Sequence, residues 1–183
     1  MKRKNNILRN IPNTISMIRI GLVVLFAISF SEHKYMKSLI IYAAAFFSDV
    51  LDGFLARRYN WITPMGKLLD PLADKLMLIT ALVCFVSTKM IPVWIPIVIG
   101  AKEFLMCIGG LLLYKSGVVV EADITGKIAT GLWAAGVVSV LIQNVVPEAA
   151  IISRIIIICA LAASMFAMIN YAVCYFGKKT RAE

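Results

Sequence analysis

The sequence is poor in the residues that bind metals through nitrogen or sulfur, because its 183 residues include one His and four Cys. The cysteines each lie in an apolar stretch without a Cys-x-x-Cys pair, which favours small buried side chains over disulfides or a zinc site. Charged residues are also scarce, at 16%, whereas 61% of the residues are hydrophobic. This surplus excludes a soluble globular enzyme, a disordered chain and a basic DNA-binding module. The cysteines are Cys84, Cys107, Cys159 and Cys174.

Six apolar segments occupy most of the chain, and each is close to the ~20 residues that a membrane-spanning helix needs. Polar residues or helix breakers separate them. Little sequence remains for a second domain, so we expect one all-α integral-membrane domain over residues 1–183, with six transmembrane helices. The predicted helices are 11–30, 36–57, 66–88, 91–114, 126–146 and 149–176.

The net charge of +9 could suggest nucleic acid binding, but the positions of Lys and Arg favour a membrane topology. If the N-terminus is cytoplasmic, the outer flanks of the predicted helices carry only three cations, Lys34, Lys37 and Lys89, and the inner flanks carry twelve. Since cytoplasmic loops are enriched in Lys and Arg, we expect both termini in the cytoplasm and no nucleic acid partner. The twelve are Lys2, Arg3, Lys4, Arg9, Arg57, Arg58, Lys67, Lys115, Lys127, Lys178, Lys179 and Arg181.

Two predicted helices carry four aspartates and three small residues at helical spacing. The first set stands at positions i, i+3, i+4 and i+7 and the second at i, i+4 and i+8, so each set lies on one helix face. The connector between the helices is short, which makes them antiparallel neighbours that can present four carboxylates across a small gap. The sets are Asp49, Asp52, Gly53 and Ala56 in the first helix, and Gly66, Asp70 and Asp74 in the second.

Four carboxylates that lie close together repel one another and therefore need cations. Ligation by oxygen alone selects Mg²⁺, Mn²⁺ or Ca²⁺, and two metals about 3.5–4 Å apart could share four carboxylates. The small residues would leave room for a ligand against the helix backbone, and Arg57 is suited to a diphosphate. Two other interpretations exist: small residues often only pack membrane helices, and aspartates can relay ions in an ion-coupled transporter.

The stretch from Asp49 to Asp74 matches the pattern D-x2-D-G-x2-A-R-x8-G-x3-D-x3-D at every fixed position. The chain therefore resembles the CDP-alcohol phosphotransferase family, and six membrane helices extend the resemblance over nearly the whole sequence. The resemblance implies that a phosphatidyl group passes from a CDP-linked donor, usually CDP-diacylglycerol, to an alcohol with release of CMP.

The resemblance also implies roles for individual residues. Two divalent metal ions, Mg²⁺ or Mn²⁺, would be the cofactors, and Asp74 would contact metal and act as the base that activates the acceptor hydroxyl. The metal ligands would be Asp49, Asp52, Asp70 and Asp74, and the nucleotide site would contain Gly53, Ala56, Arg57 and Gly66.

Further stretches narrow the acceptor. Residues 10–19 resemble the start of bacterial phosphatidylglycerophosphate synthases and of cardiolipin synthases, which suggests donor-side roles for Asn13 and Arg19; alternatively, this stretch only begins a helix. Residues 102–104 and 126–130 resemble elements of the phosphatidylglycerophosphate synthases. On this basis Lys102, Lys127 and Arg154 would surround the acceptor phosphate.

The departures from that branch keep an alternative open. Lys102 stands where Arg is usual and lacks its bidentate fork, and Ala129 replaces a second Lys. Lys102 could also form a local ion pair with Glu103. We therefore expect glycerol 3-phosphate as the acceptor, with phosphatidylglycerol, the acceptor of a cardiolipin synthase, as the alternative.

The expected location is a bacterial inner membrane, with the active site facing the cytoplasm and membrane lipid around the helices. The sequence leaves open whether the protein is a monomer or a homodimer.

Overall fold

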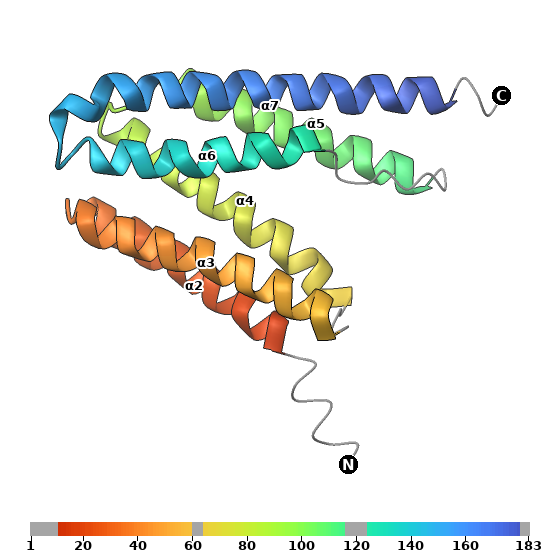
Figure 1. Ribbon diagram of the computed structural model, residues 1–183, viewed down its shortest axis with the longest axis horizontal. Coiled ribbons are helices and arrows are strands. Elements are labelled where there is room, and N and C mark those ends of the chain that lie inside the picture. Colours follow the sequence, from red (N-terminus) through yellow and green to blue (C-terminus); the bar gives the residue numbers. More distant parts are fainter. Residues whose placement is uncertain (1–10, 60–63, 116–123, 180–183) are drawn as a thin grey trace, which may run out of the picture. The chain divides into compact units, whose positions relative to one another are not determined.

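The computed structural model describes the backbone of residues 11–59, 64–115 and 124–179, and most side chains within 15–50, 72–109 and 124–173. Each predicted segment corresponds to one long helix, and the described ranges contain no strand, so the all-α class is confirmed. The helices are α2 (Ile11–Ser31), α3 (Tyr35–Tyr59), α4 (Pro64–Ser87), α5 (Trp94–Lys115), α6 (Ile124–Ile142) and α7 (Ala150–Lys179), with a 3₁₀ turn η1 (Pro147–Ala149) before α7 (Figure 1).

The largest boundary difference is at the end of α6, which stops at Ile142 although the apolar pattern predicts helix to residue 146. The N–H groups of Val145 and Val146 both bond the Ile142 carbonyl at 2.8 Å, which closes a turn. The Asn144 side-chain amide donates to the Val140 carbonyl at 2.9 Å. These bonds satisfy the last carbonyls of α6, so the helix ends although apolar residues continue.

Helices α2, α3 and α4 form one packed unit, in which α2 lies against both α3 and α4. Buried aromatic rings join the three helices: Phe30 of α2 lies 5.6 Å from Phe85 of α4, and Phe26 of α2 lies 6.2 Å from Tyr42 of α3, measured between ring centroids. Each such pair contributes about 0.5–1.5 kcal/mol beyond its burial. Helix α2 is therefore held against both helices that carry the aspartates.

Helices α5, α6 and α7 belong to a second unit, residues 89–183, built around the antiparallel α6–α7 hairpin (Figure 1). Gly136 of α6 is buried where a Cβ atom would lie 2.9 Å from Cδ1 of Ile157 on α7, so the absence of a side chain lets the helices approach closely. The Ser153 hydroxyl of α7 lies 2.8 Å from the Ser139 carbonyl of α6 and fixes their register. One domain over residues 1–183 stays a prediction.

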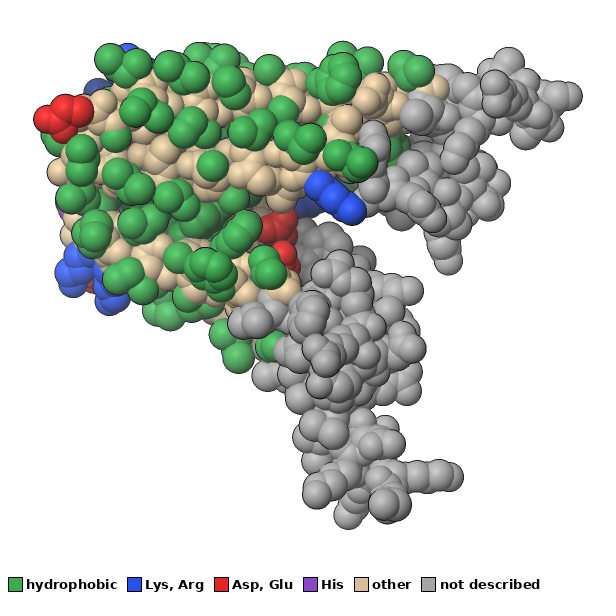
Figure 2. Space-filling view, in the orientation of Figure 1, with side chains coloured by type: hydrophobic (Ala, Val, Ile, Leu, Met, Phe, Trp, Pro, Cys, Tyr) green, Lys and Arg blue, Asp and Glu red, His purple; other side chains and the backbone are tan. Residues whose placement is uncertain are grey.

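The described helices expose many large apolar side chains. Ile124–Ile142 and Pro147–Val173 are each long and apolar enough to cross a membrane, among the residues that the structure describes. On α7, Ile151, Ile155 and Phe166 are exposed, and Figure 2 shows hydrophobic side chains over much of the visible described surface. Such extensive apolar exposure fits a lipid environment rather than water. The protein is therefore membrane-associated.

Helix α2 ends in a turn that requires a left-handed residue. The Lys34 N–H bonds the Ser29 carbonyl at 3.0 Å and the His33 N–H bonds the Phe30 carbonyl at 2.9 Å, with φ of 58° at His33. This is the Schellman arrangement, which usually has Gly at the left-handed position. We expect His33→Val to lower the free energy of unfolding by about 1–2 kcal/mol, because β-branched residues are strained there, and His33→Gly to preserve it. Denaturation in detergent measures both, and equal stability of the two variants would contradict the prediction.

Candidate active site

The four aspartates lie on two continuous helices, Asp49 and Asp52 on α3, Asp70 and Asp74 on α4. The predicted helical spacing of each set is therefore confirmed at the level of the backbone. Several of the predicted side chains lie outside the described residues, namely those of Asn13, Asp52, Gly53, Ala56, Arg57, Gly66 and Asp70.

Tyr42 of α3 is a buried residue near the aspartates that was not singled out from the sequence. It is buried on α3 seven residues before Asp49, which places both on one helix face. Its side chain interacts electrostatically with Asp74 of α4. Tyr42 and Asp49 therefore share one face of α3, and the charge of Asp74 acts on Tyr42 from α4. The seven-residue spacing between Tyr42 and Asp49 was visible in the sequence and could have identified this residue.

Arg19 of α2 is buried, with about 1% of its surface exposed, and its guanidinium Nη1 lies 2.7 Å from Oδ1 of Asp49. The Asp49 side chain is 42% exposed, so the cation is enclosed while the carboxylate reaches the surface of this unit. The sequence assigned Arg19 to the donor nucleotide. The structure places it in an ion pair with one of the four aspartates, and this contact joins α2 to α3 at the predicted metal site; the donor-side role stays a prediction.

The described part of the site fits a hard divalent cation. Asp49 is half-exposed and Asp74 is exposed, so both carboxylates are accessible to a ligand. Carboxylate oxygens are the ligands that Mg²⁺ and Mn²⁺ prefer. Among the described side chains no three His, Cys, Asp or Glu residues lie together. The described side chains include those of Asp49 and Asp74 but not those of Asp52 and Asp70.

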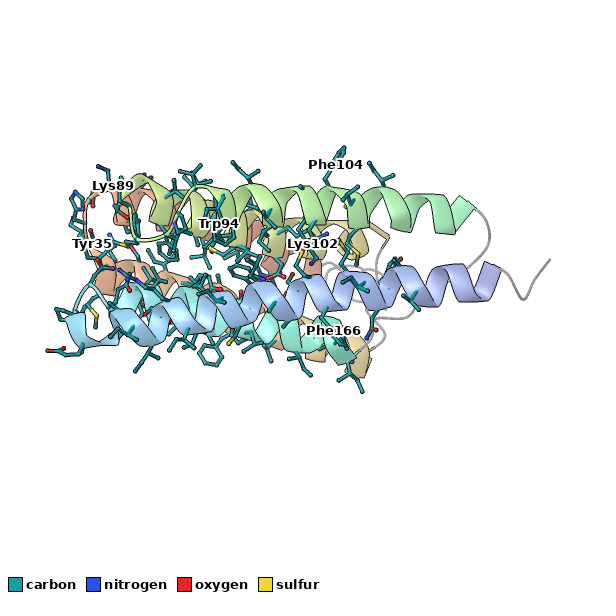
Figure 3. The ribbon with its side chains drawn as sticks, turned by 90° about the horizontal axis from the view of Figure 1, so that it is seen from above. Tyr35, Lys89, Trp94, Lys102, Phe104 and Phe166 are labelled. Carbon is teal, nitrogen blue, oxygen red and sulfur yellow. The ribbon has the colours of Figure 1, made fainter. Side chains whose placement is uncertain are left out.

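Lys102, a predicted acceptor residue, lies in α5 with its Nζ 2.7 Å from Oε1 of Glu103. Both side chains are largely enclosed, at 13% and 19% exposure. Figure 3 shows Phe104 pointing outward from α5 on the side opposite to Lys102, and Phe104 is exposed. The structure therefore contains the local ion pair that was the alternative interpretation of Lys102, and the Glu103 carboxylate balances its charge.

The structure does not bring Lys127 and Arg154 together. Lys127 is exposed in the first turn of α6. Arg154 is exposed on α7, next to Ser153, which contacts Ser139 of α6. Lys127 precedes Ser139 by twelve residues, which corresponds to about 18 Å along the helix axis at 1.5 Å per residue. The hairpin thus carries these two cations at well-separated levels, and it does not form a pocket around both.

The helices and their two pairs of aspartates define a helical, membrane-associated protein with an acidic site on α3 and α4. The CDP-alcohol phosphatidyltransferase family matches residues 9–171. The chain therefore belongs to this family, as the aspartate pattern predicted, and it is an enzyme of the phosphatidyltransferase class.

Curated relatives represent two branches of the family. The chain is 34% identical to a CDP-diacylglycerol–glycerol-3-phosphate 3-phosphatidyltransferase of Bacillus subtilis, over 74% of this chain and 78% of the relative. It is 35% identical to an enzyme of the same name from Aquifex aeolicus, with the same coverage. A CMP-forming cardiolipin synthase of Streptomyces coelicolor is also 35% identical, over 66% of this chain and 59% of the relative.

Proposed function

We propose that this protein transfers the phosphatidyl group of CDP-diacylglycerol to sn-glycerol 3-phosphate, which yields phosphatidylglycerophosphate and CMP. The observation that carries the proposal is the complete aspartate pattern on α3 and α4, with Asp74 exposed on α4. The names of the Bacillus and Aquifex relatives support this acceptor. An ion-coupled transporter, the other class compatible with the carboxylates, would release no CMP.

We further propose that all six long helices span a bacterial inner membrane, with both termini and the active site on the cytoplasmic side. The helices contain 19 to 30 residues, and about 20 suffice to cross the hydrocarbon core. The excess of Lys and Arg on the inner flanks supports this orientation. In this orientation, the acyl tails of the donor remain in lipid while the head group of the donor reaches the ends of α3 and α4.

In the proposed mechanism, Asp49, Asp52, Asp70 and Asp74 hold two divalent ions, and Gly53, Ala56, Arg57 and Gly66 bind the nucleotide diphosphate. Bound Mg²⁺ or Mn²⁺ would neutralise the diphosphate and the charge on the leaving CMP. Asp74 also accepts the proton of the acceptor hydroxyl. The oxygen of that hydroxyl attacks the phosphorus attached to the glycerol of the lipid. The bond from this phosphorus to the bridging oxygen breaks, and CMP leaves with that oxygen.

The acceptor phosphate is proposed to bind Lys127, with Lys102 as a second candidate. Lys127 is exposed in the first turn of α6, where helix N–H groups also favour anions. Lys102 is already balanced by Glu103, which weakens its attraction for a dianion. This observation favours the second candidate function, a cardiolipin synthase, because phosphatidylglycerol carries a phosphodiester with a single negative charge. Arg154 lies at another level of the hairpin, so its proposed contact with the acceptor is separate from that of Lys127.

The choice of acceptor is tested by measuring CMP release from CDP-diacylglycerol in the presence of Mn²⁺. The acceptors compared are glycerol 3-phosphate, phosphatidylglycerol, inositol 1-phosphate and serine. We expect turnover with glycerol 3-phosphate, and we expect Lys127→Ala to raise its KM by roughly 10–100-fold, because a hydrogen bond to a charged group contributes about 1.5–3 kcal/mol. The donor KM should change little, since the proposed nucleotide site lies on α3 and α4.

Lys37→Ala is the matched control, because Lys37 is an exposed cation of α3 far from the aspartates along the helix. It should leave both KM values unchanged. Turnover with phosphatidylglycerol and none with glycerol 3-phosphate would overturn the first choice of acceptor, and absence of CMP release with every acceptor would overturn the enzymatic proposal.

A further inference from the structure

The Arg19–Asp49 ion pair is asymmetric. The Arg19 side chain is among the largest fully buried side chains of the described residues, whereas the Asp49 side chain that it contacts is 42% exposed. The contact engages Oδ1 of Asp49 at 2.7 Å. One end of the pair is thus fixed inside the first unit, and the other end lies at the site where the family pattern places a metal ligand.

Burial makes this contact persistent. An Arg side chain stays protonated in proteins, and an enclosed cation without an anionic partner is costly. Arg19 comes from α2, which also packs against α4. The position of its guanidinium is therefore set by the packing of all three helices in the unit. A carboxylate bound to such a fixed group loses rotational freedom, and its repulsion from neighbouring aspartates is reduced.

We infer that Arg19 is a positioning residue for the metal site, which holds Asp49 of α3 in the orientation that binds a divalent cation, and that it is not a ligand of the donor diphosphate. The inference rests on the proposed metal site. A donor phosphate on Arg19 would have to reach an enclosed guanidinium and displace Asp49 from it. Removal of a side chain that holds a metal ligand in place typically lowers the metal affinity about 10–100-fold.

The test compares Mn²⁺ binding and donor binding in the purified full-length protein. Arg19→Met removes the charge but keeps apolar volume, and Arg19→Lys keeps the charge without the planar fork. In the absence of donor, we expect Arg19→Met to raise the dissociation constant for Mn²⁺, followed by electron paramagnetic resonance of free Mn²⁺, about 10–100-fold. Arg19→Lys should recover part of this loss. At saturating Mn²⁺, the affinity for CDP-diacylglycerol should stay within about threefold of wild type.

A double-variant comparison separates positioning from general stability. If Arg19 acts through Asp49, adding Arg19→Met to Asp49→Asn should weaken the residual Mn²⁺ binding no further. Lys37→Met, an exposed cation of α3, is the control and should leave Mn²⁺ binding unchanged. Thermal unfolding in detergent identifies a variant that fails to fold, in which case Arg19→Lys alone carries the test through a smaller loss of Mn²⁺ affinity.

The outcomes distinguish the inference from the function on which it rests. Loss of donor affinity with unchanged Mn²⁺ binding would make Arg19 a donor ligand and overturn the inference. Unchanged or tighter Mn²⁺ binding in Arg19→Met would also overturn it, because Arg19 would then be neutral or a competitor of the metal. A wild-type protein that binds no Mn²⁺ would instead overturn the proposed metal site itself.

Discussion

Asp74→Asn is expected to lower kcat for CMP release by about 10²–10⁴-fold, which is the usual contribution of a general base. The carboxamide has nearly the same shape as the carboxylate but cannot accept the proton of the acceptor hydroxyl. Asp74 is exposed on α4, so an acceptor can reach it. Turnover at saturating glycerol 3-phosphate and Mn²⁺ measures the effect.

Binding of CDP-diacylglycerol should largely survive in this variant, because Asp49, Asp52 and Asp70 still supply carboxylates for the metal ions. The control is Glu32→Gln, which neutralises an exposed acid in the turn after α2 and should leave kcat unchanged. If donor binding disappears together with turnover, Asp74 is mainly a metal ligand and another group is the base.

The helices could be predicted from the sequence because apolar runs of about 20 residues bounded by polar residues have few alternatives to a membrane helix. The predicted 11–30 segment became α2 (Ile11–Ser31) with one residue of difference. The end of α6 was missed because the turn there depends on the bond from the Asn144 side chain to the Val140 carbonyl, and apolar residues on both sides conceal it.

The predicted faces of α3 and α4 follow from residue spacing within one helix, and continuous helices at both places confirm them. Spacing does not tell which neighbouring helix covers a face. Arg19 and Asp49 come from different helices, and the packing of α2 on α3 decides that they meet. This contact could not be derived from local patterns.

The levels of Lys127 and Arg154 were, by contrast, accessible from the sequence. Both lie near the start of their helices, and the two helices of a hairpin run in opposite directions. Counting residues from the turn after α6 would have placed them at different levels. The resemblance of residues 126–130 suggested Lys127, and Arg154 was added as a further cation, but position along the helix axis also decides whether two side chains can share a ligand.

Asp52→Asn and Asp70→Asn are each expected to lower CMP release by at least about 10²-fold, with Asp49→Asn as a third member of the series. Each change removes one anionic oxygen donor from the proposed metal cluster, and a neutral amide oxygen balances less of the charge of Mg²⁺ or Mn²⁺. The loss should be partly relieved by raising the metal concentration, because the weakened step is metal binding. Asp74→Asn, in which the base is missing, should gain little from added metal.

EDTA should abolish the activity of the wild type, and an excess of Mn²⁺ or Mg²⁺ should restore it, since the reaction would lack both charge neutralisation and orientation of the diphosphate without a cation. The matched control is again Glu32→Gln, which should require the same metal concentration as wild type. Normal turnover of either aspartate variant at low Mn²⁺ would remove that residue from the ligand set. Full activity of the wild type in EDTA would contradict a dissociable metal cofactor. Arg and Lys side chains alone would then have to balance the charge on the diphosphate.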